Sequence, residues 1–490
     1  MPDRQLQIDT ASGRIAGALE DEVRCWKGIP YAAPPLGRGR WRAPEPATPW
    51  AGVRPALAFG PDFPQAANAV SRAPAMSEDC LYLNIWAPAG AEPGTLPVMV
   101  WLHGGGFVAG SGADARCCGR QLARQGVVVV SFNYRSGVFG FLAHPGLSRE
   151  APQGTSGNYG LLDQIAALRW VRANIAAFGG DPGRVTAFGV SAGSASIALL
   201  LTSPAAEGLF QRATLHSPGT GRPLAGLGDA EAAGAALGGV EELRGLSADQ
   251  LLALTSRLNP AVRGLTSPRV LRPICDGWLI REDERKAFAA GRLHRMPLIV
   301  GTNADEGTLL TRAWPVRTAA DNRALITANF PNAPAEALAF YGCDDEDDAG
   351  VGVAEAFADT QFNYGARLLL RSMTALGQEC WRYRFVRRRP GQADGPHHGD
   401  EVGHVFGNLG VGRNGAGEAF DATDLALSNA MMRAWAAFAC DGKPGAPGGV
   451  EWPAFEIDRD GPLEFGDTIR GGTDLRRAQL DFLERCHGAG

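Results

Sequence analysis

Long apolar segments are missing from this sequence of 490 residues. The two longest apolar runs, at 127–130 and 197–201, are far shorter than the roughly 20 residues that a membrane-spanning helix needs. Residues 1–17 also lack the apolar core and the small-residue cleavage site of a signal peptide. We therefore expect neither a membrane partner nor a secretory signal.

Basic charge is scarce as well. The 47 Lys and Arg residues are outnumbered by 52 Asp and Glu residues, which gives a formal net charge of −5. Binding nucleic acid requires a basic surface that neutralises phosphates, so we expect no nucleic-acid partner. The densest basic stretch, RYRFVRRR at 382–389, alternates with apolar and aromatic residues and predicts a strand that ends in a solvated basic tip.

Cysteines with metal-binding spacing are absent. The nine cysteines are an odd number and form no C-x-x-C pair, which argues against a disulfide framework and a structural zinc site. We interpret the neighbours Cys117 and Cys118 as two reduced thiols near a pocket rim, and the sequence assigns them no further role. We expect no metal and no organic cofactor, and the cysteine usage indicates a cytoplasmic protein.

What the sequence does contain is the alternation of an α/β fold. The first thirty residues alternate apolar and polar side chains, which predicts small antiparallel hairpins. Two short apolar runs near glycines, LPVMVWL and VVVVSF, are typical of strands buried on both faces. A helical pattern at 160–177, another buried strand and a helix that opens at Ser191 follow, and this succession predicts a parallel sheet with crossover helices. Helical excursions at about 221–265 and 315–375 are expected to frame a pocket.

The motif Gly189-Val190-Ser191-Ala192-Gly193 lies between that strand and that helix. G-x-S-x-G in this position predicts a nucleophile elbow, a tight turn that presents the serine hydroxyl at the carboxyl edge of the sheet. Glycine is needed on both sides because neighbouring backbone approaches closely. The N-terminal amides of the following helix favour a negative charge that develops beside the serine.

A second glycine-rich motif, HGGGF at 103–107, follows the strand VMVWL. Its glycines expose backbone N–H groups, and we predict that those of Gly105 and Gly106 converge with that of Ala192 on the oxyanion of a tetrahedral intermediate. Neither G-x-x-x-x-G-K-[ST] nor G-x-G-x-x-G is present, which disfavours a phosphate loop. Phe107, at the end of the motif, is expected in the substrate pocket.

A serine nucleophile needs a general base and an acid that orients the base. In this fold the acid, and then the histidine, follow the serine along the chain. An acidic segment, NADEGT at 303–308, comes after a buried strand, and three of the eight histidines lie beyond it before the C-terminal tail: His397, His398 and His404. Spacing alone does not separate Asp305 from Glu306, or His397 from His398.

Beyond single motifs, the sequence resembles the type-B carboxylesterase and cholinesterase family. The resemblance covers about residues 5–456 and is carried by ordered segments such as GIPYAAPPLGRGRW, SEDCLYLNIW, NYRSGVFGFL, GNYGLLDQIAALRWV and HHGDEVGHVFG. It implies one α/β-hydrolase domain over residues 1–490, with a mostly parallel twisted sheet flanked by helices. It also implies that Ser191 is the nucleophile, Glu306 the orienting acid and His398 the base of a carboxylesterase whose partner is a small-molecule ester.

Two further residues are placed by this resemblance. Ser217 lies where the family often has a buried serine near the triad, and either a supporting hydrogen bond or packing would account for it. His404 falls where the family usually has a bulky residue, so we interpret it as a pocket or core histidine.

Two departures from the family pattern shape the expected chemistry. Val190 stands where the family usually has Glu, so the pocket floor loses a carboxylate. This predicts neutral or acidic esters, of short to medium length or bulky, rather than choline esters. Cys80 normally pairs with an upstream cysteine, but FGPDFPQ occupies the matching region, so Cys80 is expected to be unpaired unless Cys25 reaches it. Hydrolysis of carbamates or activated amides is the alternative activity, and binding without catalysis is a further one.

Overall fold

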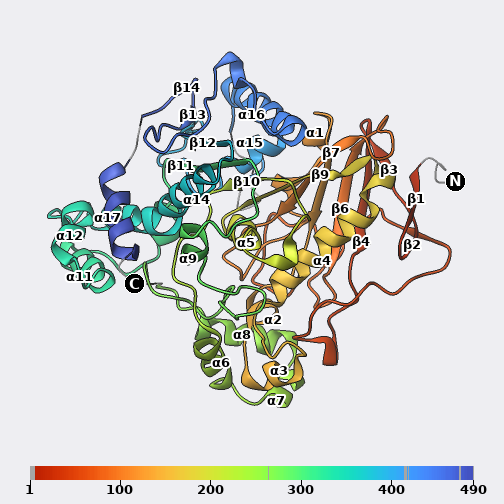
Figure 1. Cartoon of the computed structure of the whole chain (residues 1–490), viewed down its shortest axis with the longest axis horizontal. Coiled ribbons are helices and arrows are strands. Elements are labelled where there is room, and N and C mark those ends of the chain that lie inside the picture. The colour runs from red at the N-terminus through yellow and green to blue at the C-terminus, as the bar shows by residue number, and fades with distance from the viewer. Residues whose placement is uncertain (1–5, 263, 413–416, 418, 474–475, 489–490) are drawn as a thin grey trace.

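A sheet of eleven strands forms the centre of the computed structural model, which describes residues 6–262, 264–412, 417, 419–473 and 476–488 (Figure 1). The strand order is β14-β13-β12-β11-β10-β9-β7-β8-β6-β4-β3. All neighbours from β8 to β13 are parallel, whereas β3, β4 and β6 at one edge and β14 at the other pair antiparallel. The mostly parallel sheet and the N-terminal antiparallel hairpins predicted from the sequence are both confirmed.

The strands of this sheet span β3 Ala18–Glu20, β4 Val23–Pro30, β6 Tyr82–Pro88, β7 Leu96–Leu102, β8 Val128–Phe132, β9 Gly180–Val190, β10 Arg212–His216, β11 Leu298–Asn303, β12 Cys380–Phe385, β13 Leu463–Phe465 and β14 Ile469–Gly471. A separate small sheet contains β1 Gln7–Thr10, β2 Gly13–Ala16 and β5 Val53–Pro55.

The longer helices are α4 Tyr159–Asn174, α5 Ala192–Leu200, α6 Leu227–Ala235, α8 Ala248–Leu258, α11 Ala319–Asn329, α12 Pro334–Tyr341, α13 Ala349–Ala358, α14 Tyr364–Ala375, α16 Ala422–Asp441 and α17 Arg477–Gly488. Shorter ones are α1 Arg120–Ala123, α2 Gly137–Phe141, α3 Pro145–Glu150, α7 Val240–Gly245, α9 Glu284–Ala289, α10 Thr308–Thr311 and α15 Val402–Phe406. A π-helical turn, η6 Asp359–Asn363, joins α13 to α14.

Each face of the sheet carries its own apolar core because successive side chains of a strand point to opposite faces. Val98 and Val100 of β7 belong to the core that also contains residues of α4, α5 and α14. Met99 and Trp101 belong to the core that contains residues of α15 and α16. Strands buried on both faces have near-continuous apolar sequences, and this explains why the runs in β7 and β8 are so easily recognised.

Helices fill the two segments in which the sequence predicts helical excursions. Helices α6, α7 and α8 lie at the lower edge of the view in Figure 1, and α11 and α12 lie at its left. The assignment of residues 1–490 to one domain stays a prediction.

The basic stretch at 382–389 departs in part from the expected solvated tip. Arg387 is only 7% exposed, and its guanidinium contacts Asp424 at 2.8 and 3.0 Å and Asp467 at 2.6 Å. Its neighbour Arg382 is equally buried. The predicted strand is present as β12, and Arg388 in the tip is exposed as expected. The prediction is wrong for Arg387, because its counter-charges come from residues far along the chain.

All nine cysteines are free thiols, and Cys80, Cys117 and Cys118 are buried. The expectation that Cys80 is unpaired is confirmed, and Cys25 does not bridge to it. Over the described ranges, no helix combines the length and the apolar character that crossing a membrane would require.

Candidate active site

Ser191 occupies a strained turn between β9 and α5. Its backbone has φ 58° and ψ −117°, a region that residues other than glycine rarely adopt. Its N–H donates to the carbonyl of His216 at 2.9 Å, which holds the turn against β10. A Cβ added to Gly193 would lie 2.0 Å from the carbonyl oxygen of Leu102, so no larger residue fits there. The predicted elbow is therefore present in its local geometry.

The glycine loop after β7 lies directly against this turn. A Cβ added to Gly104 would lie 3.2 Å from the Cβ of Ser191. Gly105 and Gly106 both have positive φ, at 118° and 63°. Within the described part of the chain, their N–H groups have no hydrogen-bond acceptor. The amide of Ala192 is the first of α5, where N–H groups also lack intrahelical partners. These three amides are thus available for an anion beside Ser191.

His398 is held by a buried carboxylate. Its Nδ1 lies 2.6 Å from Oε2 of Glu306, and the two residues are 6% and 1% exposed. A carboxylate accepts the Nδ1 proton, so Nε2 carries the lone pair of the neutral ring. Among the residues that the structure describes, Nε2 has no hydrogen-bond partner. Phe362 stacks on the ring with centroids 4.3 Å apart and restricts its orientation.

The second oxygen of Glu306 is bound just as tightly. Oε1 accepts hydrogen bonds of 2.5 Å from the hydroxyl of Ser217 and from the backbone N–H of Asn303. The side-chain amide of Asn303 in turn donates to Glu401 at 2.5 Å. Of the two explanations for Ser217, the structure favours the hydrogen bond. Ser217 supports the carboxylate and does not line the cavity, so its assignment to the substrate pocket is wrong.

Asp305 and His397, which sequence spacing alone could not distinguish from Glu306 and His398, contact other residues. His397 Nε2 lies 3.1 Å from Asp394 and 3.8 Å from Asp305. Asp305 also accepts the N–H of Thr308 at the start of α10. Neither His397 nor Asp305 lines the cavity that contains Ser191.

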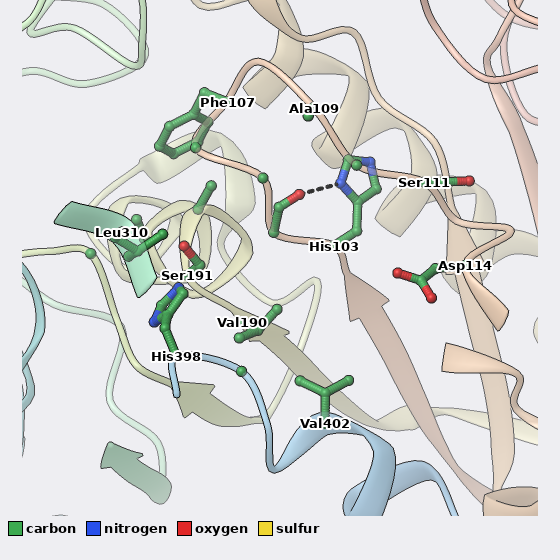
Figure 2. Close-up of a pocket in the computed structure, with 18 of the residues that line it drawn as sticks. His103, Phe107, Ala109, Ser111, Asp114, Val190, Ser191, Leu310, His398 and Val402 are labelled. Carbon is green, nitrogen blue, oxygen red and sulfur yellow. Dashed lines mark hydrogen bonds between the residues drawn. The ribbon is translucent and has the colours of Figure 1, made fainter. Parts of the chain in front are cut away.

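A cavity of about 480 Å³ opens beside Ser191 and His398. Figure 2 shows these two side chains next to each other, with Leu310 to their left and Val190 to their right in this view. Phe107 also lines the cavity, as predicted, and so does Cys117, whereas Cys118 does not. The lining residues Val190, Phe107 and Leu310 give much of the wall an apolar character.

His404 lies outside this cavity. It is 2% exposed, and its Nε2 is 3.4 Å from Oδ1 of Asp424 on α16. Of the two interpretations left open by the sequence, the core histidine is the one that its surroundings favour.

Four arginines in the cavity wall escaped the sequence analysis: Arg116, Arg222, Arg269 and Arg272. Arg222, Arg269 and Arg272 come from the long connections around α6 to α8, which carry no recognisable motif. Gln361 and Phe362, on the π-helical turn η6, were missed for the same reason. Across the described residues, no group of three or more His, Cys, Asp or Glu side chains could hold a metal ion.

Comparison with known proteins shows which family the chain belongs to. The model of the carboxylesterase family matches residues 4–483. The chain belongs to the carboxylesterase family. A carboxylesterase has the α/β-hydrolase fold, and this chain is accordingly a serine carboxylic ester hydrolase, for which small-molecule esters are the substrates.

Related carboxylesterases match nearly the whole chain. A fumonisin B1 esterase of Sphingopyxis macrogoltabida is 44% identical over 96% of this chain and 88% of its own length. A para-nitrobenzyl esterase of Bacillus subtilis is 38% identical over 91% of this chain and 92% of its own. The solved structure of a PNB esterase superposes with a TM-score of 0.86 at 34% identity, and covers 98% of this chain and 99% of its own.

Proposed function

We propose that this carboxylesterase hydrolyses esters through a triad of Ser191, His398 and Glu306 and an acyl-enzyme on Ser191. One observation carries the proposal. His398 is fixed by a 2.6 Å hydrogen bond from Nδ1 to buried Glu306 and lines the same cavity as Ser191, and its Nε2 has no partner among the described residues. This means that Nε2 makes no hydrogen bond to Ser191 here. Hydrogen bonds between a catalytic base and its nucleophile often form fully only once substrate is bound.

In this mechanism, Oγ of Ser191 attacks the ester carbonyl while Nε2 of His398 takes its proton. The N–H groups of Gly105, Gly106 and Ala192 bind the oxyanion of the tetrahedral intermediate. His398 then donates the proton to the leaving alcohol, and the acyl-enzyme remains. Water attacks it with the same histidine as base, and the acid leaves. Glu306 holds the tautomer and stabilises the imidazolium.

The substrate preference follows from the cavity wall. Val190 at its floor places no carboxylate beside Ser191, so we propose neutral or acidic esters rather than choline esters. Two relatives are named for fumonisin B1 and for a para-nitrobenzyl ester, which supports bulky substrates as well as short ones. Carbamates and activated amides are alternative substrates for the same nucleophile. We further propose a cytoplasmic location, supported by nine unpaired thiols.

A fluorophosphonate probe tests the nucleophile. We expect one probe per chain, attached to Ser191 in the peptide mass spectrum. The Ser191→Ala variant should remain unlabelled and lose roughly 10⁴–10⁶-fold in kcat on 4-nitrophenyl butyrate, with an unchanged thermal midpoint. An unlabelled wild-type protein, or a variant that keeps its turnover, would overturn the triad.

A substrate panel on the same preparation tests the preference. Butyrylcholine and its neutral isostere 3,3-dimethylbutyl butyrate differ only in charge, and the neutral ester should have the higher kcat/KM. Comparison of 4-nitrophenyl butyrate with butyric 4-nitroanilide and with a 4-nitrophenyl carbamate shows whether esters are the preferred class.

A further inference from the structure

The cavity beside Ser191 carries an excess of positive charge. Among its lining residues, the four arginines face a single acidic side chain, Asp114, and Asp114 pairs with Arg116 at 2.5 Å. Three guanidinium groups remain, those of Arg222, Arg269 and Arg272. In the part of the chain with a described structure, none of the three lies within 4.0 Å of a carboxylate oxygen. This excess contrasts with the formal net charge of −5 for the whole chain.

The first two guanidinium groups are held by one neutral amide. Nη1 of Arg222 and Nη2 of Arg269 both donate to Oε1 of Gln361, the latter at 2.5 Å. The amide group of Gln361 is oriented in turn, since its Nε2 donates to the carbonyl of Leu265 at 2.9 Å and to the hydroxyl of Thr360 at 3.1 Å. Two cations therefore converge on one uncharged oxygen.

The third guanidinium is also bound only to a neutral acceptor. Nη2 of Arg272 donates to the carbonyl of Gly219 at 3.2 Å, and its guanidinium carbon lies 5.5 Å from the centroid of the Phe107 ring. Arg272 is 4% exposed and Arg222 is 7% exposed. The Nε atoms of Arg222, Arg269 and Arg272 are buried and have no partner among the described residues. Each group thus has one buried donor that no acceptor among the described residues satisfies.

A further buried acid, Glu284, only partly offsets the charge of Arg272. Glu284 is 1% exposed, accepts the N–H of Gly221 at 2.7 Å, and forms no ion pair with Arg272 within the described ranges. Burial raises the pKa of Glu284 to about 7, so this side chain carries only part of a negative charge near neutral pH. A buried charge without a counter-ion is costly, and such groups are normally paired.

We infer that Arg222, Arg269 and Arg272 form a carboxylate-binding subsite, and that the preferred substrate is an ester carrying at least one further carboxylate. This inference rests on the proposed ester hydrolysis at Ser191. Guanidinium presents a planar set of donors that matches a carboxylate, so a substrate carboxylate would supply the missing counter-charge.

The geometry of η6 links this subsite to the reacting centre. Gln361, which holds two of the arginines, is followed by Phe362, which stacks on His398. A substrate carboxylate in the subsite and an ester carbonyl at Ser191 would therefore occupy one cavity, and about 480 Å³ is within the usual range for small ligands.

Matched ester pairs test the subsite. On the acyl side, the pair is the 4-nitrophenyl monoester of glutaric acid and its neutral isostere, the 4-nitrophenyl ester of glutaramic acid. On the alcohol side, it is 4-carboxyphenyl butyrate and 4-carbamoylphenyl butyrate. We expect a kcat/KM at least ten times higher for the anionic member of at least one pair. Arg222→Gln and Arg272→Gln should each lower that ratio about 10- to 100-fold, the usual range for a lost hydrogen bond to a charged group.

The matched control is Arg292→Gln, which removes the same charge from a side chain that is 57% exposed and paired with Glu282 at the surface. It should leave the ratio unchanged, and Arg222→Lys should retain part of it. Equal kcat/KM within both pairs, or equal ratios in all variants, would overturn the subsite.

A binding measurement separates the subsite from the proposed catalysis. Glutarate should bind to the Ser191→Ala protein in a calorimetric titration, and at least tenfold more weakly when Arg222→Gln is added. Absence of glutarate binding together with active hydrolysis of neutral esters would overturn the subsite and leave the esterase intact. Glutarate binding in a protein whose wild-type form hydrolyses no ester would overturn the proposed catalysis and leave the subsite intact.

Discussion

Two regions of the molecule contain buried arginine, histidine and carboxylate side chains, and they differ in how the charges are matched. In the Arg387 cluster (Arg387, His404, Asp421, Asp424 and Asp467), the guanidinium contacts three carboxylates at 2.6 to 2.9 Å, of which Asp424 is buried and Asp421 and Asp467 are exposed. His404 also turns its Nε2 towards Asp424. In the cavity, by contrast, Arg222, Arg269 and Arg272 donate to neutral oxygens, and Nε2 of His398 has no hydrogen-bond partner among the described residues.

The difference separates structural from functional charge. A buried ion pair whose members satisfy each other contributes to the fold and offers nothing to a ligand. Polar groups left without partners in a cavity cost free energy in the empty protein and regain it when a ligand binds. The same residue types thus serve two purposes, and the pairing distinguishes them.

The sharpest way to test this comparison is to replace one histidine from each region. His398→Gln should lower kcat by roughly 10⁴–10⁶-fold because the proton acceptor for Ser191 is lost. His404→Gln should stay within about tenfold of the wild-type kcat, since His404 lies outside the cavity. Both kcat values are measured on 4-nitrophenyl butyrate. Similar losses in the two variants would contradict the distinction.

A smaller effect should appear when arginines are replaced and stability is measured. Arg387→Met leaves buried Asp424 without its main cation and should destabilise the protein by about 3–5 kcal/mol. Arg222→Met leaves no carboxylate unpaired and removes a buried charge, so its cost should be below about 1 kcal/mol. Urea unfolding of both variants against wild type gives the two values. If Arg222→Met were the more destabilising change, Arg222 would stabilise the fold instead of serving a ligand.

The same contrast explains what the sequence could reveal. The elbow at Ser191 and the loop at Gly105 were predictable because close backbone approach demands glycine at fixed spacing, and such motifs are local. The parallel sheet was predictable because strands buried on both faces have continuous apolar runs. The choice between Glu306 and Asp305 required the family resemblance, since adjacent residues have equal spacing.

Pairings between distant residues were beyond this kind of reasoning. Arg387 appeared solvated because its carboxylates, at 424 and 467, belong to other elements. Arg222 was missed because its partner Gln361 lies 139 residues further along the chain. Charge matching of this kind depends on the tertiary structure, and the periodicity of the sequence does not predict it.

Acid titration tests the smallest expected difference. The contributions of the two regions to the free energy of unfolding should be lost over different pH ranges. Burial lowers the pKa of His103, in the glycine loop, to about 4. An unfolded histidine takes up its proton near pH 6.5, so unfolding binds a proton between these values. Stability should therefore fall by up to about 3 kcal/mol as the pH drops from 6.5 to 4.

The Arg387 cluster should respond only at lower pH. Although burial raises the pKa of Asp424, hydrogen bonds from His404 and Arg387 lower it overall, so its contribution is present above the unfolded pKa of about 3.9 and is lost below it. Unfolding free energies of wild type and His103→Gln are measured from pH 7.5 to 3, and their difference isolates the contribution of His103. His487, whose pKa burial also lowers, contributes equally to both proteins. The variant should show a shallower slope between pH 6.5 and 4 and the wild-type slope below it. Parallel curves over the whole range would show that His103 titrates normally in the folded protein.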